Sequence, residues 1–188
     1  MSQRADPPAH SSKSRLHLVS RYIPVFGAIA LFLAALEFLF PKPVPFMRIG
    51  LANIPILLAL DLFPFSGLML LVCIKVLGQG LVNGTLASYV FVFSLAGSFS
   101  SAVVMYALKK ILKTRITLLG TSVAGALVSN TIQSLLSIFL IFGPEARVIV
   151  PYFLGIGTAG SIIVGIISEQ FSVKSAWYAV VASQCRGS

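Results

Sequence analysis

Charged residues are scarce in this sequence, and most of the few that occur are basic. Only 10% of the 188 residues are charged, with five acids against fourteen Lys and Arg, whereas soluble domains average about 25% charged residues. Hydrophobic residues make up 57% of the chain, which is more apolar side chain than one soluble core of this length could bury. This composition excludes a disordered chain and predicts that the surrounding solvent is lipid.

Several chemical signatures are missing as well. The five acids, Asp6, Glu37, Asp61, Glu145 and Glu169, are isolated from one another, so there is no aspartate-rich motif for Mg²⁺ and diphosphate. The sequence contains no G-x-x-x-x-G-K-[ST] loop for ATP and no His/Cys cluster for zinc or haem. Two Cys are too few for a disulfide scaffold. We therefore predict a non-enzyme without metal or cofactor, whose energy supply, if it uses ATP, comes from another subunit.

What is abundant is long apolar sequence. A membrane-spanning helix needs about 20 mostly apolar residues, and no alternating pattern typical of a membrane β-barrel occurs. We predict an all-α integral membrane protein, a bundle of six transmembrane helices. The second run is short, so five spans with a re-entrant second segment is the alternative. The six runs are Tyr22–Phe40, Ile49–Leu60, Phe65–Val82, Leu86–Leu108, Ile116–Phe142 and Val148–Ile167.

The basic residues predict the orientation. Residues 1–21 are expected to form a flexible basic cytoplasmic tail, residues 22–171 the membrane domain, and residues 172–188 a short cytoplasmic tail. On this plan ten Lys and Arg lie on the face that carries both termini and three on the other face. Cytoplasmic loops carry the excess of Lys and Arg. We therefore predict a multi-pass protein of the bacterial cytoplasmic (inner) membrane with both termini cytoplasmic. The scattered charges do not predict nucleic-acid binding.

Polar residues inside the apolar runs share helical faces. Lys75, Gln79 and Asn83 follow one another at intervals of four, and Asn130 and Gln133 lie on one side of the fifth run. Intramembrane polar groups are costly and therefore indicate function. We predict that these groups converge on a substrate-binding cavity in the outer half of the bundle, lined by Glu37, Asn53, Lys75, Gln79, Asn83, Asn130 and Gln133.

Each of these groups also has a structural interpretation. Ser, Asn and Gln often bridge helices in lipid by hydrogen bonds. Lys75 is the hardest to explain in this way, because a cation in the middle of a membrane needs a partner. We expect that partner to be Glu37 or an anionic ligand, with Arg48 as a second cation and Glu37 as a group that pairs with Lys75 or gates the site.

Five segments together resemble a known membrane family. They are Gly50–Asn53, Lys75–Gly84, Ser94–Ser98 running on to Ser101 and Met105, Ser122–Gln133, and Pro151. From Met47 to about Phe171 the chain resembles the Gx transporter family, whose members are often labelled heptaprenyl diphosphate synthase component I. That family looks like the S components of energy-coupling-factor (ECF) transporters, which are six-helix proteins that bind a nutrient from outside.

The resemblance implies partners as well as a fold. An S component works with a transmembrane T component and two ATPase subunits, and an A-x-x-x-A motif on its first helix docks the T component. Ala30 and Ala34 match that motif. We therefore expect the substrate-binding subunit of an ECF-type importer, with an anionic or isoprenoid-related small molecule as ligand. The alternatives are a noncatalytic membrane component of a heptaprenyl or polyprenyl diphosphate synthase, partnered by a soluble prenyl synthase subunit, and a helical scaffold without a ligand.

Overall fold

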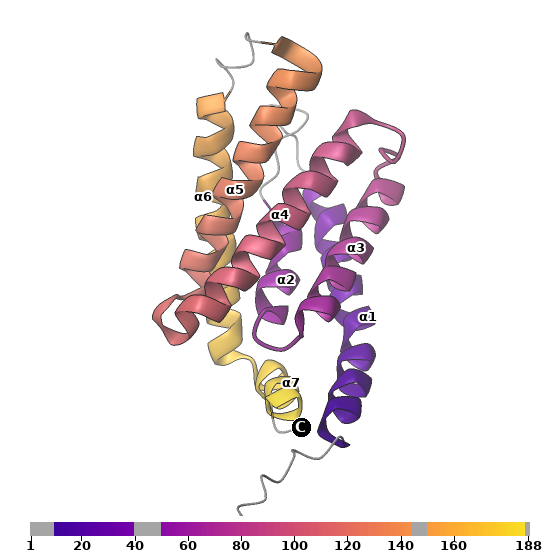
Figure 1. Cartoon of the computed structure of the whole chain (residues 1–188), viewed down its shortest axis with the longest axis vertical. Helices are drawn as coiled ribbons and strands as arrows, with labels where there is room; N and C mark the ends of the chain where they lie inside the picture. The colour runs from indigo at the N-terminus through magenta and orange to yellow at the C-terminus, as the bar shows by residue number, and fades with distance from the viewer. Residues whose placement is uncertain (1–9, 40–49, 144–149, 187–188) are drawn as a thin grey trace, which may run out of the picture.

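The computed structural model describes residues 10–39, 50–143 and 150–186, and all regular structure in these ranges is helical (Figure 1). The predicted all-α class is confirmed for them. Short helical turns cover Leu51–Asn53 (η1), Lys113–Arg115 (η2) and Ile138–Phe142 (η3). The longer helices are α1 (His10–Leu39), α2 (Ile54–Ala59), α3 (Phe65–Val82), α4 (Tyr89–Leu112), α5 (Leu118–Ser137), α6 (Val150–Lys174) and α7 (Ala176–Arg186).

Five helices in the described part of the chain are long and apolar enough to cross a membrane, which agrees with the alternative of five spans rather than with six full spans. The chain is a multi-pass membrane protein. The candidate spans are Ser20–Leu39, Phe65–Val82, Tyr89–Leu112, Leu118–Leu140 and Val150–Lys174.

The run predicted as a second span, Ile49–Leu60, forms η1 and the short helix α2 instead. Nine helical residues rise roughly 15 Å, which is half the thickness of the hydrocarbon core. Residues 55–60 are all buried within the chain, so protein rather than lipid surrounds α2. A helix enclosed on all sides is apolar all round, and its composition therefore resembles that of a span.

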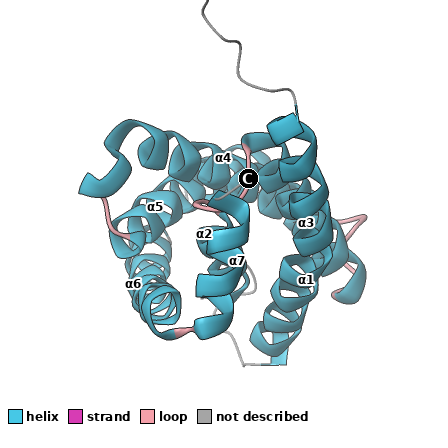
Figure 2. Ribbon diagram, turned by 90° about the horizontal axis from the view of Figure 1, so that it is seen from below, coloured by secondary structure: helices cyan, strands magenta, loops and turns pink. Residues whose placement is uncertain are grey.

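The five long helices form a ring around α2. Each of the pairs α1–α3, α3–α4, α4–α5 and α5–α6 is in contact, and α2 contacts both α1 and α6 at the open side of the ring. In the end-on view, α2 lies between α1 and α3 on one side and α5 and α6 on the other (Figure 2). The ring therefore has an interior that polar side chains can line without touching lipid.

The first described turns of α1 and the helix α7 lie at the same end of the bundle (Figure 1). A hydrogen bond joins them there, since the Tyr22 hydroxyl donates to Gln184 Oε1 at 2.6 Å. The described ends of the chain therefore lie at one end of the bundle, as the prediction of both termini on one side requires. Which side of the membrane that is stays a prediction from the basic residues. We call it the inner end below.

Both predicted tails are helical where the structure describes them. Residues 10–21 begin α1 rather than forming a flexible tail, and residues 1–9 lie outside the described part. After Lys174 the chain continues into α7, whose Tyr178 and Val181 are buried against the bundle. The Trp177 ring stacks at 5.8 Å from the ring of Phe26 on α1. The helix α7 is therefore part of the fold.

Helices α5 and α6 approach one another closely. A Cβ atom at Gly165 of α6 would lie 2.7 Å from the Cα of Leu119 on α5, which is closer than such atoms can come. A glycine at this position is what allows the two backbones to touch. Small residues at helix contacts are typical of membrane bundles, because packing rather than water exclusion holds the helices together.

Candidate functional site

Polar side chains from separate helices meet in one cavity inside the ring, of about 60 Å³. Six of the seven predicted substrate-binding residues line it, namely Glu37, Asn53, Lys75, Gln79, Asn130 and Gln133. They come from α1, η1, α3 and α5, and α4 and α6 supply further walls. The structure therefore brings these residues together as the sequence predicted, while their binding role stays a prediction.

Asn83 is the exception. It does not line the cavity, because α3 ends at Val82 and Asn83 is the residue that caps its end. Its backbone N–H donates to the carbonyl of Gln79 at 3.0 Å. Arg48, the expected second cation of the site, lies outside the described residues.

Glu37 is engaged by the backbone of the turn that precedes α2. Its side chain is 2% exposed, and its two carboxylate oxygens accept hydrogen bonds from the N–H groups of Gly50 (3.1 Å) and Leu51 (3.0 Å). Gly50 has a φ of 89°, a left-handed conformation that suits glycine. The carboxylate therefore satisfies backbone donors at the start of η1.

Lys75 reaches the same turn from α3. Its side chain is 5% exposed, and its Nζ donates to Asn53 Oδ1 at 2.5 Å. The contacts described therefore link Lys75 and Glu37 through the turn between them. Glu37 holds the beginning of the Gly50–Asn53 turn, and Lys75 binds the side chain at its end.

Two amides of α5 lie against glycines of neighbouring helices. A Cβ at Gly157 of α6 would lie only 2.1 Å from Asn130 Nδ2, and one at Gly97 of α4 would lie 2.6 Å from Gln133 Nε2. These glycines therefore make room for the amide groups. Gln133 Nε2 also donates to Ser129 Oγ at 2.8 Å. Asn130 Nδ2, in contrast, is buried with no acceptor in the described structure.

Hydroxyl groups complete the lining, and the sequence analysis did not place them among the binding residues. Ser122 Oγ donates to the carbonyl of Ser161 on α6 at 2.8 Å, and Ser161 Oγ donates to the carbonyl of Thr158 at 2.7 Å. The sequence of α6 does contain a face of small and polar residues, because Gly157, Ser161 and Ser168 lie on one side of the helix. The cavity-lining serines are Ser98, Ser101, Ser122, Ser129 and Ser161.

The two alanines expected to dock a partner are buried inside this chain. Ala30 is 0% exposed and Ala34 is 3% exposed. A second protein can reach them only if the chain uncovers them, so in this structure they do not form a docking surface.

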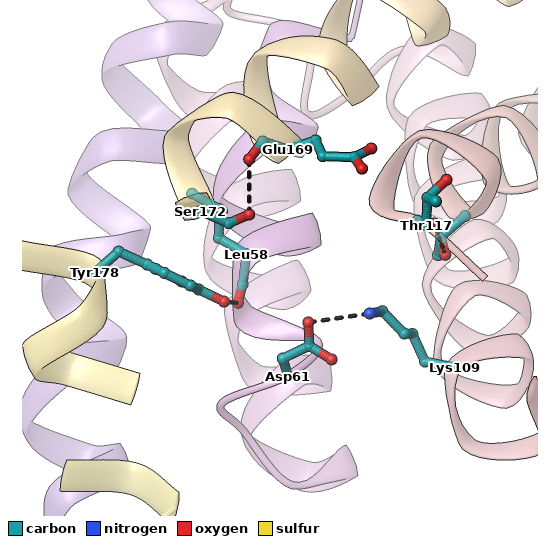
Figure 3. A network of polar contacts seen from close by, with 8 residues as sticks. Leu58, Asp61, Lys109, Thr117, Glu169, Ser172 and Tyr178 are labelled. Atoms are coloured by element: carbon teal, nitrogen blue, oxygen red, sulfur yellow. Dashed lines mark hydrogen bonds and ion pairs between the residues drawn. The ribbon is translucent and has the colours of Figure 1, made fainter. Parts of the chain in front are cut away.

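A second group of polar contacts lies at the inner end (Figure 3). The Lys109 ammonium of α4 pairs with Asp61 at 3.0 Å, and the Tyr178 hydroxyl of α7 donates to the carbonyl of Leu58 at 3.1 Å. These contacts fix the end of α2 to α4 and α7. They are structural, and they hold in place the short helix whose other end carries Asn53.

Comparison with known protein families gives a match over most of the chain. A model of the family described as heptaprenyl diphosphate synthase component I matches residues 26–171, which include every residue of the cavity. No curated protein and no solved structure matches the chain.

Proposed function

We propose that this chain, which belongs to the heptaprenyl diphosphate synthase component I family, is the substrate-binding membrane subunit of an importer of ECF type. The observation that supports this function most strongly is the polar cavity inside an otherwise apolar ring of helices. It contains a buried lysine, a buried glutamate and four amide side chains. Ionisable side chains at membrane depth are costly, and they usually belong to substrate sites or pathways.

The position of the cavity supports capture from the outer side. Glu37 and Gln79 lie near the ends of α1 and α3 that are far from the termini, and Asn53 lies where α2 begins. If both termini are cytoplasmic, as the basic residues predict, these groups occupy the outer half of the membrane. A solute from outside would then reach them without crossing the whole bilayer.

The partners in this proposal are a T component and two ATPase subunits. The sequence has no ATP-binding loop of its own, so an energised importer needs separate ATPases. The family description supports a second candidate, a noncatalytic membrane component that assists a soluble prenyl diphosphate synthase.

Co-purification separates the two candidates. The tagged full-length chain would be extracted from its native membrane in mild detergent, and the bound proteins and small molecules identified by mass spectrometry. A T component together with ATPases is the result expected for the importer. A soluble prenyl synthase in their place would overturn the importer proposal and support the second candidate.

A pair of variants tests whether the cavity holds the co-purified small molecule. Lys75→Met removes the buried ammonium, and Lys110→Met removes an exposed one at the inner end as the matched control. We expect the small molecule to be lost from Lys75→Met and retained by Lys110→Met. Equal retention by both variants would place the molecule elsewhere.

A further inference from the structure

A groove of about 430 Å³ lies on the outside of the ring, between the inner ends of α1 and α3. These two helices are neighbours in the bundle (Figure 1). Leu70, which lines the groove, is 50% exposed, so the groove faces the surroundings of the bundle rather than its interior. Its lining includes Ser20, Ile23 and Pro24 of α1 and Ser66, Leu70 and Ile74 of α3.

The groove extends along one leaflet of the membrane. It starts where both candidate spans begin, at Ser20 and Phe65. From Ser66 to Ile74, α3 rises about 12 Å, and half of the hydrocarbon core is about 15 Å thick. At the other end of the groove, a Cβ on Gly27 would lie 3.1 Å from Ile74 Cγ2, so α1 and α3 touch there. The groove therefore runs from the headgroup level through most of one leaflet.

The size and lining of the groove favour a lipid chain as its occupant. The side chains along its length are apolar, since Ile23, Leu70 and Ile74 follow one another toward the middle of the membrane. A transmembrane helix is 10–12 Å wide, so a 12 Å length of it fills roughly 1,000 Å³, more than twice the volume of the groove. A single acyl chain is thin enough to lie between the two helices and gains continuous apolar contact there.

The polar end of the groove favours an anionic headgroup. Arg21 directly follows Ser20 and is exposed, and a long basic side chain at the end of a span reaches to the headgroup level. The first turn of α3 begins after Pro64, and no side chain caps it. Its first N–H groups have no acceptor within the helix, and this end of the helix dipole is positive. Both features attract a phosphate group.

We propose that the groove between α1 and α3 binds an anionic phospholipid of the leaflet at the inner end. One acyl chain lies against Ile23, Leu70 and Ile74, and the phosphate lies near Arg21 and the first turn of α3. This site is separate from the cavity inside the ring, and it depends neither on the importer function nor on the synthase alternative. Two other occupants, a prenyl diphosphate and a helix of a partner protein, are decided by the tests below.

Lipid retention measured by native mass spectrometry tests the headgroup. The purified full-length chain in mild detergent is incubated with equal amounts of phosphatidylglycerol and phosphatidylcholine that carry the same acyl chains. We expect phosphatidylglycerol to be retained about fivefold more, because one basic residue near the membrane surface contributes about 1 kcal/mol. Equal retention of the two lipids would overturn the anionic headgroup. Displacement of phosphatidylglycerol by an equal amount of farnesyl diphosphate would overturn a phospholipid as the occupant.

Two variants with matched controls locate the site. Arg21→Gln should abolish the preference for phosphatidylglycerol, and Arg115→Gln, which removes an exposed arginine between α4 and α5, should keep it. Leu70→Trp fills the groove and should lower the retention of both lipids at least fivefold. Leu77→Trp places the same ring on an exposed position of α3 outside the groove and should retain lipid like the wild type. Equal behaviour within either pair would overturn the site.

Photocrosslinking in the native membrane tests the remaining occupant. A photoreactive benzoylphenylalanine is placed at position 70 of the full-length chain, and the mass of the chain is measured after irradiation. We expect the chain to gain the mass of a phospholipid, because a bound acyl chain lies against Leu70. A crosslink to a second protein would overturn the proposal and assign the groove to a partner helix.

Discussion

A substitution at Gly157 should change the shape of the cavity while it leaves the stability of the fold nearly unchanged. In Gly157→Ala, the new Cβ would lie 2.1 Å from Asn130 Nδ2, 2.8 Å from its Cγ and 3.0 Å from its Oδ1. Ordinary contact begins near 3.4 Å, so the amide nitrogen has to move by about 1.3 Å. A shift of this size breaks a hydrogen bond, whose donor–acceptor distances span only about 0.5 Å.

The expected cost falls on binding rather than on folding. Because Asn130 Nδ2 has no protein acceptor in the described structure, moving it breaks no protein hydrogen bond. We expect the free energy of unfolding to change by less than about 1 kcal/mol. The displaced amide destabilises the fold, and the preference of alanine over glycine in a helix, which is about 1 kcal/mol, offsets this. A lost ligand hydrogen bond at a buried donor costs about 1–3 kcal/mol, which weakens binding by about tenfold or more.

Two other glycines of α6 provide matched controls. Gly155→Ala meets no atom within 4 Å, so it should leave binding unchanged and raise stability by up to about 1 kcal/mol through helix propensity alone. Gly165→Ala meets the backbone of Leu119 at 2.7 Å, so α5 and α6 have to separate. Overpacking of this kind costs about 1–3 kcal/mol. Thermal unfolding in nanodiscs measures stability, and the amount of small molecule that co-purifies with each variant measures binding. If Gly157→Ala retained as much of the co-purified small molecule as the wild type, or lost as much stability as Gly165→Ala, the reasoning would be refuted.

Three further predictions concern the inner end. Tyr178→Phe removes the hydroxyl that donates to the buried carbonyl of Leu58, and thermal unfolding should show a loss of about 1–2 kcal/mol; an unchanged midpoint would contradict that contact. The partly exposed Lys109–Asp61 pair should contribute less than about 1 kcal/mol in a double-mutant cycle of Lys109→Ala and Asp61→Asn, and a larger coupling would show that the pair is poorly solvated. Burial raises the pKa of the Cys185 thiol, so less thiolate forms at a given pH, and maleimide should label it more slowly than a free cysteine until the pH rises or the chain unfolds. Labelling at the rate of free cysteine would show that α7 detaches.

The polar face of each helix could be predicted because polar side chains are costly in contact with lipid. Lys75 and Gln79 lie one turn apart, as do Asn130 and Gln133, and all four line the same cavity. Periodicity identifies the face, and the cost of polar groups in lipid directs that face inward. Periodicity does not identify where a helix ends. Asn83 continues the stripe in sequence, but α3 stops before it.

The contacts of Glu37 could not be predicted in the same way. The sequence places a carboxylate and an ammonium at similar depth and suggests that they pair. The groups that donate to the Glu37 carboxylate are the backbone N–H groups of Gly50 and Leu51. Every residue except proline has such a group, so the sequence does not single these two out. Only the three-dimensional path of the chain decides which of them remain without a partner. The burial of Ala30 and Ala34 likewise depends on the ring of helices and not on their own motif.

The half-length helix α2 explains why Glu37 binds backbone N–H groups, whereas Lys75 binds the side chain of Asn53. A helix that begins inside the hydrocarbon region leaves N–H groups that lipid cannot satisfy, so the protein has to supply acceptors. Glu37 supplies them at the start, and at the other end the Leu58 carbonyl receives the Tyr178 hydroxyl. Glu37 is therefore already committed to positioning the turn that carries Asn53. Lys75 instead binds the Asn53 side chain at the end of the same turn, so both buried ionisable groups hold the segment that leads into α2.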